Sequence, residues 1–225
     1  MRNADTSKIG ILGGTFDPVH LGHLRTALEI GQELELEKVY LIPAASPPHK
    51  KHDPVTSFDH RLAMVRLAIR DSEVLEALDL EGRRAGLSYS CDTLKELKSR
   101  FGMNSQIFFL IGSDAFLEIR TWKDHEKLFD YAHFVLIPRS GHNPETLDGF
   151  ILGLDESAKR QQGKNVYTMH SGNHVIIQPS TVMDISGTRI RNMVRRGKSI
   201  AYLVPETVRK YIAEKGLYTL HEDHR

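Results

Sequence analysis

A short apolar run that passes through two glycines into a helical pattern is the feature that most constrains the fold of this chain. Ile9 to Leu12 has the pattern of a buried strand, and Leu24, Ala27 and Leu28 recur at helical spacing. Gly13-Gly14 between them lets the backbone turn tightly and approach a ligand closely. The pattern therefore predicts a strand, a tight turn and a helix, the repeating unit of α/β folds.

The segment after these glycines carries two histidines. It reads Thr15-Phe16-Asp17-Pro18-Val19-His20-Leu21-Gly22-His23, so both imidazoles lie at the start of the predicted helix. Helix N-termini have unpaired N–H groups and partial positive charge, which attract phosphates. A His pair three residues apart could instead bind a metal. The only cysteine is Cys91, and no further Cys/His pattern supplies ligands. We therefore favour a nucleotide-phosphate site and predict no metal ligand from the protein.

The remaining sequence alternates strand-like and helical patterns, which predicts a doubly wound, mostly parallel α/β sheet covered on both faces. Further strands are expected at Val39 to Ile42, Ile107 to Ile111, His133 to Ile137 and His174 to Ile177, and also at Ala77 to Leu80, where Leu75 to Leu80 could alternatively be helical. Helices are expected at Phe58 to Ile69, at Cys91 to Arg100 with Ser88 or Ser90 as N-cap and Gly102 past the end, and at Pro205 to Lys215 followed by Gly216.

Length and composition limit the class of protein. The chain has 225 residues, of which 40% are hydrophobic and 26% charged, as in an ordinary soluble domain. No apolar run is long enough to span a membrane, the first residues lack a signal-peptide core, and the net charge of +1 gives no basis for nucleic-acid or membrane binding. A single cysteine fits a reducing compartment, so we expect a cytoplasmic protein. The sequence does not predict the oligomeric state.

One domain is expected over residues 8–218. It would lie between a flexible N-terminus, residues 1–7, and a tail, residues 219–225. Residues 140–172 are rich in Gly, Asn, Gln and charge, and we interpret them as an insertion-like, partly mobile connection. A doubly wound domain binds its ligands at the carboxyl ends of its strands. Gly13 and Gly112 both follow such predicted strand ends.

A second motif reads Ile185-Ser186-Gly187-Thr188-Arg189-Ile190-Arg191. Taken alone it could be an ordinary capped helix start, because Ser186 precedes the helical pair Ile190 and Val194. Small hydroxyl residues at a helix N-terminus, followed one turn later by arginine, also form a cradle for a triphosphate.

Together the two motifs resemble those of the nucleotidyltransferase superfamily that carries a His-x-Gly-His signature. Members transfer a nucleotidyl group from a nucleoside triphosphate, and their Ile-Ser-x-Thr-x-Ile-Arg motif closes over the β- and γ-phosphates. Gly187 stands where members often have serine, which removes one hydroxyl contact.

Other segments are similar to those of the bacterial nicotinate mononucleotide adenylyltransferases. The matching residues run from about Lys8 to Tyr218 outside the insertion-like middle, and they are Ile42-Pro43, Pro47-Pro48-His49-Lys50, Gly112-Ser113-Asp114, Trp122, and the ending from Tyr202-Leu203-Val204-Pro205 to Gly216-Leu217-Tyr218.

The resemblance implies a Rossmann-like nucleotidyltransferase fold and a reaction of NAD biosynthesis. ATP and nicotinate mononucleotide would give nicotinate adenine dinucleotide and pyrophosphate, with Mg²⁺ arriving as the ATP complex. The acceptor phosphate is itself a nucleophile, so direct in-line attack needs no general base from the protein. The resemblance places His20 and His23 on the α-phosphate and the bridging region, and Arg191 on the leaving pyrophosphate.

The same resemblance implies the binding residues. For ATP they are Gly13, Gly14, Thr15 and Phe16 at the phosphates, Gly112 and Asp114 at the ribose, and Ile185, Ser186, Thr188 and Arg189 around the triphosphate and adenine. For the acceptor they are Trp122, on which the cationic ring would stack, the Lys123 N–H and the Ser90 hydroxyl for the carboxylate, and Lys50 for the acceptor phosphate or the triphosphate. Lys50 could equally be a solvated loop lysine, and Lys123 stands where the family often has an aromatic residue.

Two other functions stay open from the sequence. A sister enzyme on the same fold could adenylate phosphopantetheine or cytidylate a phospho-alcohol, although such chains usually lack the surroundings of Tyr89 and Trp122. A non-catalytic nucleotide-binding module is a second alternative. The intact histidines and Arg191 argue against it, because a sensor does not need contacts to a leaving group.

Overall fold

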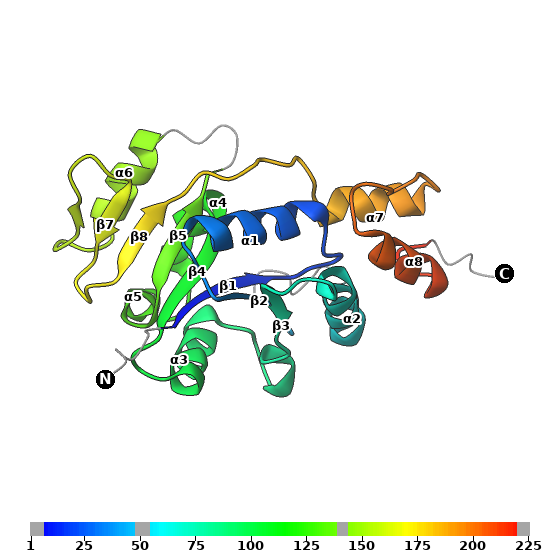
Figure 1. Cartoon of the computed structure of the whole chain (residues 1–225), viewed down its shortest axis with the longest axis horizontal. Helices are drawn as coiled ribbons and strands as arrows, with labels where there is room; N and C mark the ends of the chain where they lie inside the picture. The colour runs from blue at the N-terminus through cyan, green and yellow to red at the C-terminus, as the bar shows by residue number, and fades with distance from the viewer. Residues whose placement is uncertain (1–6, 48–54, 139–143, 220–225) are drawn as a thin grey trace.

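A mixed β-sheet forms the centre of the computed structural model, which describes residues 7–47, 55–138 and 144–219 (Figure 1). Within these ranges the sheet has eight strands in the order β3-β2-β1-β4-β5-β8-β7-β6. The parallel strands are β1 (Lys8–Gly14), β2 (Lys38–Pro43), β3 (Leu75–Ala77), β4 (Gln106–Gly112), β5 (His133–Ile137) and β8 (His174–Ile177). Two short strands, β7 (Val166–Thr168) and β6 (Lys159–Arg160), extend one edge in antiparallel pairing. The predicted doubly wound, mostly parallel sheet is confirmed.

Helices cover both faces of the sheet and bury two separate cores. One core holds side chains from α1 (Leu21–Glu33), α2 (Phe58–Ile69), α7 (Gly187–Arg195) and α8 (Glu206–Glu214). The other holds side chains from α3 (Ser90–Phe101), α4 (Ser113–Leu117), α5 (Leu128–Tyr131) and α6 (Pro144–Leu152). Figure 1 shows α1 and α3 on opposite sides of the strands. Along β4, Phe109 and Ile111 enter one core while Phe108 and Leu110 enter the other, because successive strand side chains alternate in direction.

Most predicted elements lie where the sequence places them. Phe58–Ile69, His133–Ile137 and His174–Ile177 agree in their bounds. Three expectations need correction. The strand expected at Ala77 to Leu80 is β3, which ends at Ala77. The N-cap of α3 is Tyr89, not Ser88 or Ser90. The polar segment interpreted as a connection contains α6, β6 and β7.

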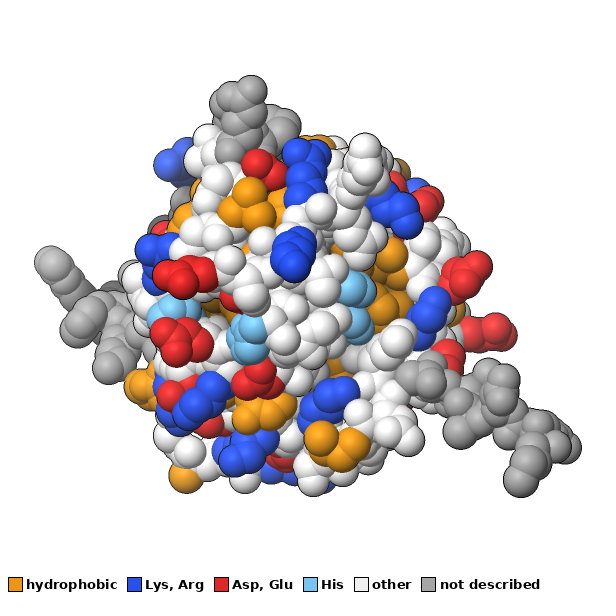
Figure 2. Space-filling view, turned by 90° about the vertical axis from the view of Figure 1, so that its left-hand side faces the viewer, with side chains coloured by type: hydrophobic (Ala, Val, Ile, Leu, Met, Phe, Trp, Pro, Cys, Tyr) orange, Lys and Arg blue, Asp and Glu red, His pale blue; other side chains and the backbone are white. Residues whose placement is uncertain are grey.

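An ionic contact connects the segments next to β6 and β7 with the rest of the fold. Figure 2, which faces the side where β7 and β8 lie, shows histidine side chains beside carboxylates on the surface. A contact of this kind is formed by His170, whose Nδ1 lies 2.9 Å from Asp155 Oδ2 and whose Nε2 lies 3.2 Å from Asp130 Oδ1. The hydrogen bond to Asp155 raises the pKa of His170 above its ordinary value. His170 therefore joins the segment before β6 to the end of α5.

Three short 3₁₀ turns complete the described elements: η2 (Glu81–Arg83), η3 (Ile119–Thr121) and η4 (His125–Lys127). No helix in the described ranges is long and apolar enough to cross a bilayer.

The strand order fixes where a ligand can bind. β1 lies between β2 and β4, so the chain proceeds from β1 toward one edge and from β4 toward the other. Doubly wound sheets bind ligands outside the carboxyl ends of the strands at such a reversal point. The turn after β1 and the turn after β4, which the sequence analysis singled out, meet there.

Candidate active site

A cavity of about 600 Å³ lies at this reversal point. Its lining brings together residues from five segments: the turn after β1, the loop after β2, the first residue of η2, the start of α3, and the stretch from β4 to the residues after η3. Among the predicted site residues the lining includes Gly13, Gly14, Thr15, His23, Ser90, Gly112, Asp114, Trp122 and Lys123.

The two histidines of the first motif are held against each other. Their rings stack with centroids 3.6 Å apart, and His20, the residue preceding α1, is buried with 6% of its surface exposed. The His20 backbone N–H donates to His23 Nδ1 at 3.2 Å. Because Nδ1 accepts, the proton of a neutral His23 ring lies on Nε2. His23 also lines the cavity.

Local backbone features make this arrangement possible. A Cβ at Gly22 would lie 3.1 Å from His20 Nδ1, so the glycine between the histidines leaves room for the His20 ring. Phe16 adopts a left-handed backbone with φ of 49°, and its buried ring meets His23 edge-on at 5.0 Å. The Gly14 position is similarly close to the Phe16 ring, at 3.2 Å from a Cβ. The glycines of the motif thus leave room for the Phe16 ring and the two imidazoles to pack together at the turn.

The opposite side of the cavity has an aromatic side chain and a helix end. Trp122 is half-buried and packs against the core beneath α3. Ser90 is the first residue of α3, whose amino end borders the cavity and carries partial positive charge. The Lys123 ammonium binds Asp92 at 2.9 Å and lies 5.0 Å from the centre of the Tyr89 ring. Lys123 thereby fixes the loop after Trp122 to α3.

Ser88 joins this side to the loop after β2. Its hydroxyl accepts hydrogen bonds from the Ala45 N–H at 3.0 Å and the Ser46 N–H at 3.1 Å, and its own N–H donates to the Ser46 carbonyl at 3.0 Å. Ser88, which the sequence suggested as an N-cap, therefore does not cap α3. It holds two loops of the cavity together.

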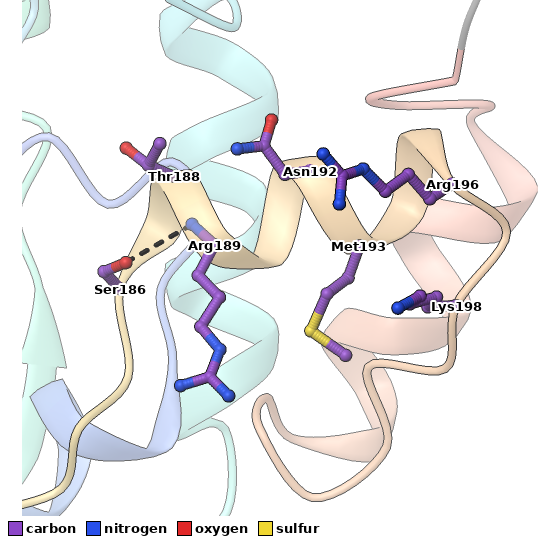
Figure 3. Close-up of a pocket in the computed structure, with 7 residues that line it drawn as sticks. All are labelled: Ser186, Thr188, Arg189, Asn192, Met193, Arg196 and Lys198. Carbon is purple, nitrogen blue, oxygen red and sulfur yellow. Dashed lines mark hydrogen bonds between the residues drawn. The ribbon is translucent and has the colours of Figure 1, made fainter.

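The second motif starts α7 and lines a separate hollow of about 510 Å³. Ser186 is the N-cap, and its hydroxyl accepts from the Arg189 N–H at 3.3 Å, as predicted for a capped helix start (Figure 3). Figure 3 shows Arg189 and Met193 extending to one side of α7 and Thr188 and Asn192 to the other. The residues lining this hollow are Ser186, Thr188, Arg189, Asn192, Met193, Arg196 and Lys198.

Asp17 connects the second motif to the first. Its backbone carbonyl accepts a hydrogen bond of 2.7 Å from Arg191 Nη1, while Arg191 Nη2 donates to Thr188 Oγ1 at 3.3 Å. A Cβ at Gly187 would lie 2.7 Å from the same carbonyl. Glycine at position 187 therefore lets α7 approach the first motif closely in this chain, which gives a physical reason for its departure from serine.

Several buried polar residues of the site were not predicted. Glu81, 8% exposed, lines the cavity and accepts from Thr93 Oγ1 at 2.7 Å. Arg61, 1% exposed, donates to backbone carbonyls around the turn after β1, and Asp17, 5% exposed, accepts from the Tyr218 hydroxyl at 2.7 Å. Burial and the adjacent Asp17 carboxylate raise the pKa of Tyr218. A signal existed only for Asp17, which stands inside the first motif.

The remaining predicted residues have varied positions. Phe16 and His20 lie under the turn, Arg191 reaches Asp17, and Ile185 packs partly against the core that contains α7. Lys50 lies outside the described residues, so its expected role stays a prediction. The described residues contain no group of three or more His, Cys, Asp or Glu side chains arranged to hold a metal ion.

Comparison with known proteins gives a consistent family. Residues 11–193 match the family described as cytidylyltransferase-like. The chain is 43% identical over 217 residues to a probable nicotinate-nucleotide adenylyltransferase of Desulfatibacillum aliphaticivorans, with 94% of this chain and 99% of the relative covered. It is 42% identical over 212 residues to a protein of the same description from Geotalea daltonii, covering 94% and 98% of the two chains.

A solved structure has the same fold. It is the nicotinic acid mononucleotide adenylyltransferase of Plasmodium falciparum in complex with NaAD, with a TM-score of 0.73 and 20% sequence identity. The alignment covers 94% of this chain and 97% of that one. At this identity the likeness supports the Rossmann-like nucleotidyltransferase fold.

Proposed function

Because the chain belongs to the nicotinate-nucleotide adenylyltransferases, within the cytidylyltransferase-like family, we propose that its cavity binds ATP and nicotinate mononucleotide and joins them. The products are nicotinate adenine dinucleotide and pyrophosphate, in the synthesis of NAD. One observation carries the proposal: a single cavity is lined both by the turn after β1, where we expect phosphate to bind, and by Trp122 and the first residue of α3.

The chemistry requires positioning more than proton transfer. An oxygen of the acceptor phosphate attacks the α-phosphorus of ATP, a new P–O bond forms, and the bond to the β-phosphate oxygen breaks. The acceptor phosphate is ionised at neutral pH, so no side chain has to remove a proton. Catalysis then depends on alignment and on stabilising negative charge at the transferring and leaving groups.

The histidines act at the transferring phosphate. His23 lines the cavity, and its Nδ1 accepts from the His20 N–H at 3.2 Å, so a neutral ring carries its proton on Nε2 and would donate it to a phosphoryl oxygen. Stacking on His20 restricts rotation of the His23 ring. The backbone of Gly14 to Phe16 and the Thr15 side chain support the same phosphates from the turn.

Arg191 acts at the leaving pyrophosphate. Its guanidinium has five N–H donors, and its hydrogen bonds to Asp17 and Thr188 leave others for phosphate oxygens. Ser186, Thr188 and Arg189 would contact the distal phosphates, with the adenine read by backbone groups between Ile185 and Arg189. Mg²⁺ enters as part of the ATP complex and neutralises charge on the triphosphate.

The acceptor occupies the Trp122 side of the cavity. A cationic pyridinium ring stacks favourably on an indole. The amino end of α3 and the Ser90 hydroxyl offer donors and partial positive charge, which suit a carboxylate better than a carboxamide. Gly112 and Asp114 would contact the adenosine ribose. Lys50 would reach the acceptor phosphate or the triphosphate.

Pyrophosphate release separates this function from its alternatives. Purified protein is given ATP and, in separate reactions, nicotinate mononucleotide, nicotinamide mononucleotide, phosphopantetheine or a phospho-alcohol, and CTP replaces ATP in a parallel set. We expect turnover with ATP and nicotinate mononucleotide and a kcat/KM about a hundredfold lower with the amide, since two mismatched buried polar groups cost roughly 1–3 kcal/mol each. Equal use of acid and amide would contradict the acceptor assignment, and turnover only with phosphopantetheine or CTP would contradict the reaction.

A further inference from the structure

Arg61 is a buried cation directly beneath the proposed phosphate site. It lies on α2 and is 1% exposed. Burial lowers the pKa of its guanidinium, while Asp17, Tyr218 and Glu81 oppose that shift. A buried charge is costly unless its donors are satisfied, so the groups that accept from Arg61 are informative.

Backbone carbonyls from three loops accept hydrogen bonds from this guanidinium. Nη1 donates to the Thr15 carbonyl and to the Ala44 carbonyl, each at 2.7 Å. Nη2 donates to the Ala45 carbonyl at 3.3 Å, and Nε to the Thr56 carbonyl at 2.7 Å. Arg61 thus joins the turn after β1, the loop after β2 and the entry to α2.

The planarity of the peptide bond converts these contacts into an orientation. In a trans peptide the C=O of one residue and the N–H of the next point in opposite directions. The loop after β2 illustrates this. The carbonyls of Ala44 and Ala45 point to Arg61, and the N–H groups of Ala45 and Ser46 point away, to the Ser88 hydroxyl.

The same rule applies to the turn after β1. The Thr15 carbonyl points to Arg61, so the Phe16 N–H points away from it. Among the described residues no hydrogen-bond acceptor for the Phe16 N–H is found. The neighbouring Thr15 lines the cavity. Phe16 also has a left-handed backbone, with φ of 49°. Residues other than glycine rarely adopt this conformation, so the surrounding structure has to hold it in place.

We propose that Arg61 is a positioning residue of the transfer reaction, which holds the Thr15–Phe16 peptide so that the Phe16 N–H faces a phosphate oxygen of ATP. It also fixes the distance between this turn and the loop after β2. The inference rests on the proposed function, because it needs ATP in the cavity. It adds a residue that does not itself touch a substrate.

Arg61→Lys tests the proposal. Lysine keeps the charge but cannot donate to four carbonyls in a planar fork. A donor that is lost or displaced by about 1 Å costs on the order of 10²-fold in rate. We therefore expect kcat to fall about a hundredfold, while the KM for nicotinate mononucleotide changes by less than about threefold, measured well below the melting temperature of the variant.

Val65→Ala is the matched control. Val65 is on the same helix, fully buried in the core that contains α2, and contacts none of the three loops through hydrogen bonds in the described chain. The Val65→Ala substitution should lower the melting temperature, because it leaves a cavity in the core, and the variant should keep the wild-type kcat at low temperature. If Arg61→Lys also keeps wild-type kcat, the proposal is overturned and Arg61 only stabilises the fold.

A spectroscopic measurement on the wild type does not depend on the variant folding. Protein labelled with ¹⁵N-phenylalanine is titrated with a non-hydrolysable methylene analogue of ATP, and the Phe16 amide is assigned through Phe16→Leu. A downfield shift of the Phe16 amide proton on binding supports the proposal, and an unmoved Phe16 amide in a saturated complex overturns it. Wild-type protein that binds no nucleotide and makes no dinucleotide contradicts the proposed function itself, which is a separate outcome.

Discussion

Replacing Arg191 by lysine should damage pyrophosphate chemistry more than acceptor binding. The guanidinium is held by the Asp17 carbonyl at 2.7 Å and by Thr188 Oγ1 at 3.3 Å, so its plane is fixed before any ligand arrives. A fixed planar fork can bind two phosphate oxygens at once, whereas an ammonium acts as a point charge. Arg191→Lys keeps the charge and removes this geometry.

The magnitude follows from the hydrogen bonds lost. One charge-assisted hydrogen bond to a phosphate oxygen is worth about 1.5–3 kcal/mol, and each 1.36 kcal/mol is a factor of ten. We expect kcat/KM for ATP to fall by roughly 10- to 160-fold and the inhibition constant of pyrophosphate to rise over a similar range. The KM for nicotinate mononucleotide should change little, because we propose that it binds on the Trp122 side of the cavity.

The assay compares initial rates and product inhibition by pyrophosphate in three proteins: wild type, Arg191→Lys and Arg195→Lys. Arg195 is one turn further along α7, exposed, and bonded to Asn192 Oδ1 at 2.9 Å, so it matches the exchange without the proposed role. Wild-type affinity of Arg191→Lys for pyrophosphate, or an equal loss in both variants, would refute the placement of Arg191 on the leaving group.

Three further predictions concern other parts of the chain. His23→Ala should keep the fold and lose about 10²–10³ in kcat, the typical cost of one phosphoryl donor, so near-full turnover at saturating ATP would remove His23 from the mechanism. Trp122→Ala should raise the KM of acid and amide acceptors alike, whereas Ser90→Ala should lower kcat/KM for the acid more than for the amide; an unchanged acid-to-amide ratio in Ser90→Ala would contradict its contact with the carboxylate. The raised pKa of His170 means that the ionic part of its contact with Asp155 is complete below its ordinary value of 6.5 and is lost as pH rises through the raised value. His170→Gln should therefore lower the free energy of unfolding, and with it the melting temperature, more at about pH 5.5 than at about pH 9. The difference between the two pH values should be under about 1 kcal/mol, because the pair is partly exposed. Scanning calorimetry at both pH values measures it, and an equal loss at both would contradict the prediction.

Periodicity explains why the sheet could be predicted and its edge could not. β1, β4 and β5 are buried on both sides, so their sequences are continuous apolar runs that allow one interpretation. β6 and β7 have two and three residues, and β6 is Lys-Arg with both side chains exposed. Such strands form because β8 offers an edge for pairing, which is a tertiary effect with no local pattern.

The site could be predicted where chemistry lies within a motif and not where it depends on distant contacts. Ser186 was expected to cap a helix because capping is local, and it does. Arg61 gave no signal, since a charged residue one position before Leu62 on a helix is normally exposed. Only the meeting of three loops around α2 explains why this arginine is buried.

The buried carboxylate of Asp17 lies close to Arg191 without a tight ion pair between them. Arg191 Nη1 bonds to the Asp17 carbonyl at 2.7 Å but lies 3.9 Å from Oδ2. The carboxylate instead accepts from neutral donors, the Tyr218 hydroxyl at 2.7 Å and the Thr56 N–H at 3.2 Å. A tight Arg191–Asp17 ion pair would have to be weakened before pyrophosphate could bind, and that cost would oppose the charge that develops on the leaving group. Because neutral groups donate the hydrogen bonds of the Asp17 carboxylate, Arg191 is oriented by a carbonyl and pairs with the carboxylate only at 3.9 Å, so we expect its attraction for a leaving pyrophosphate to be weakened less than by a tight ion pair.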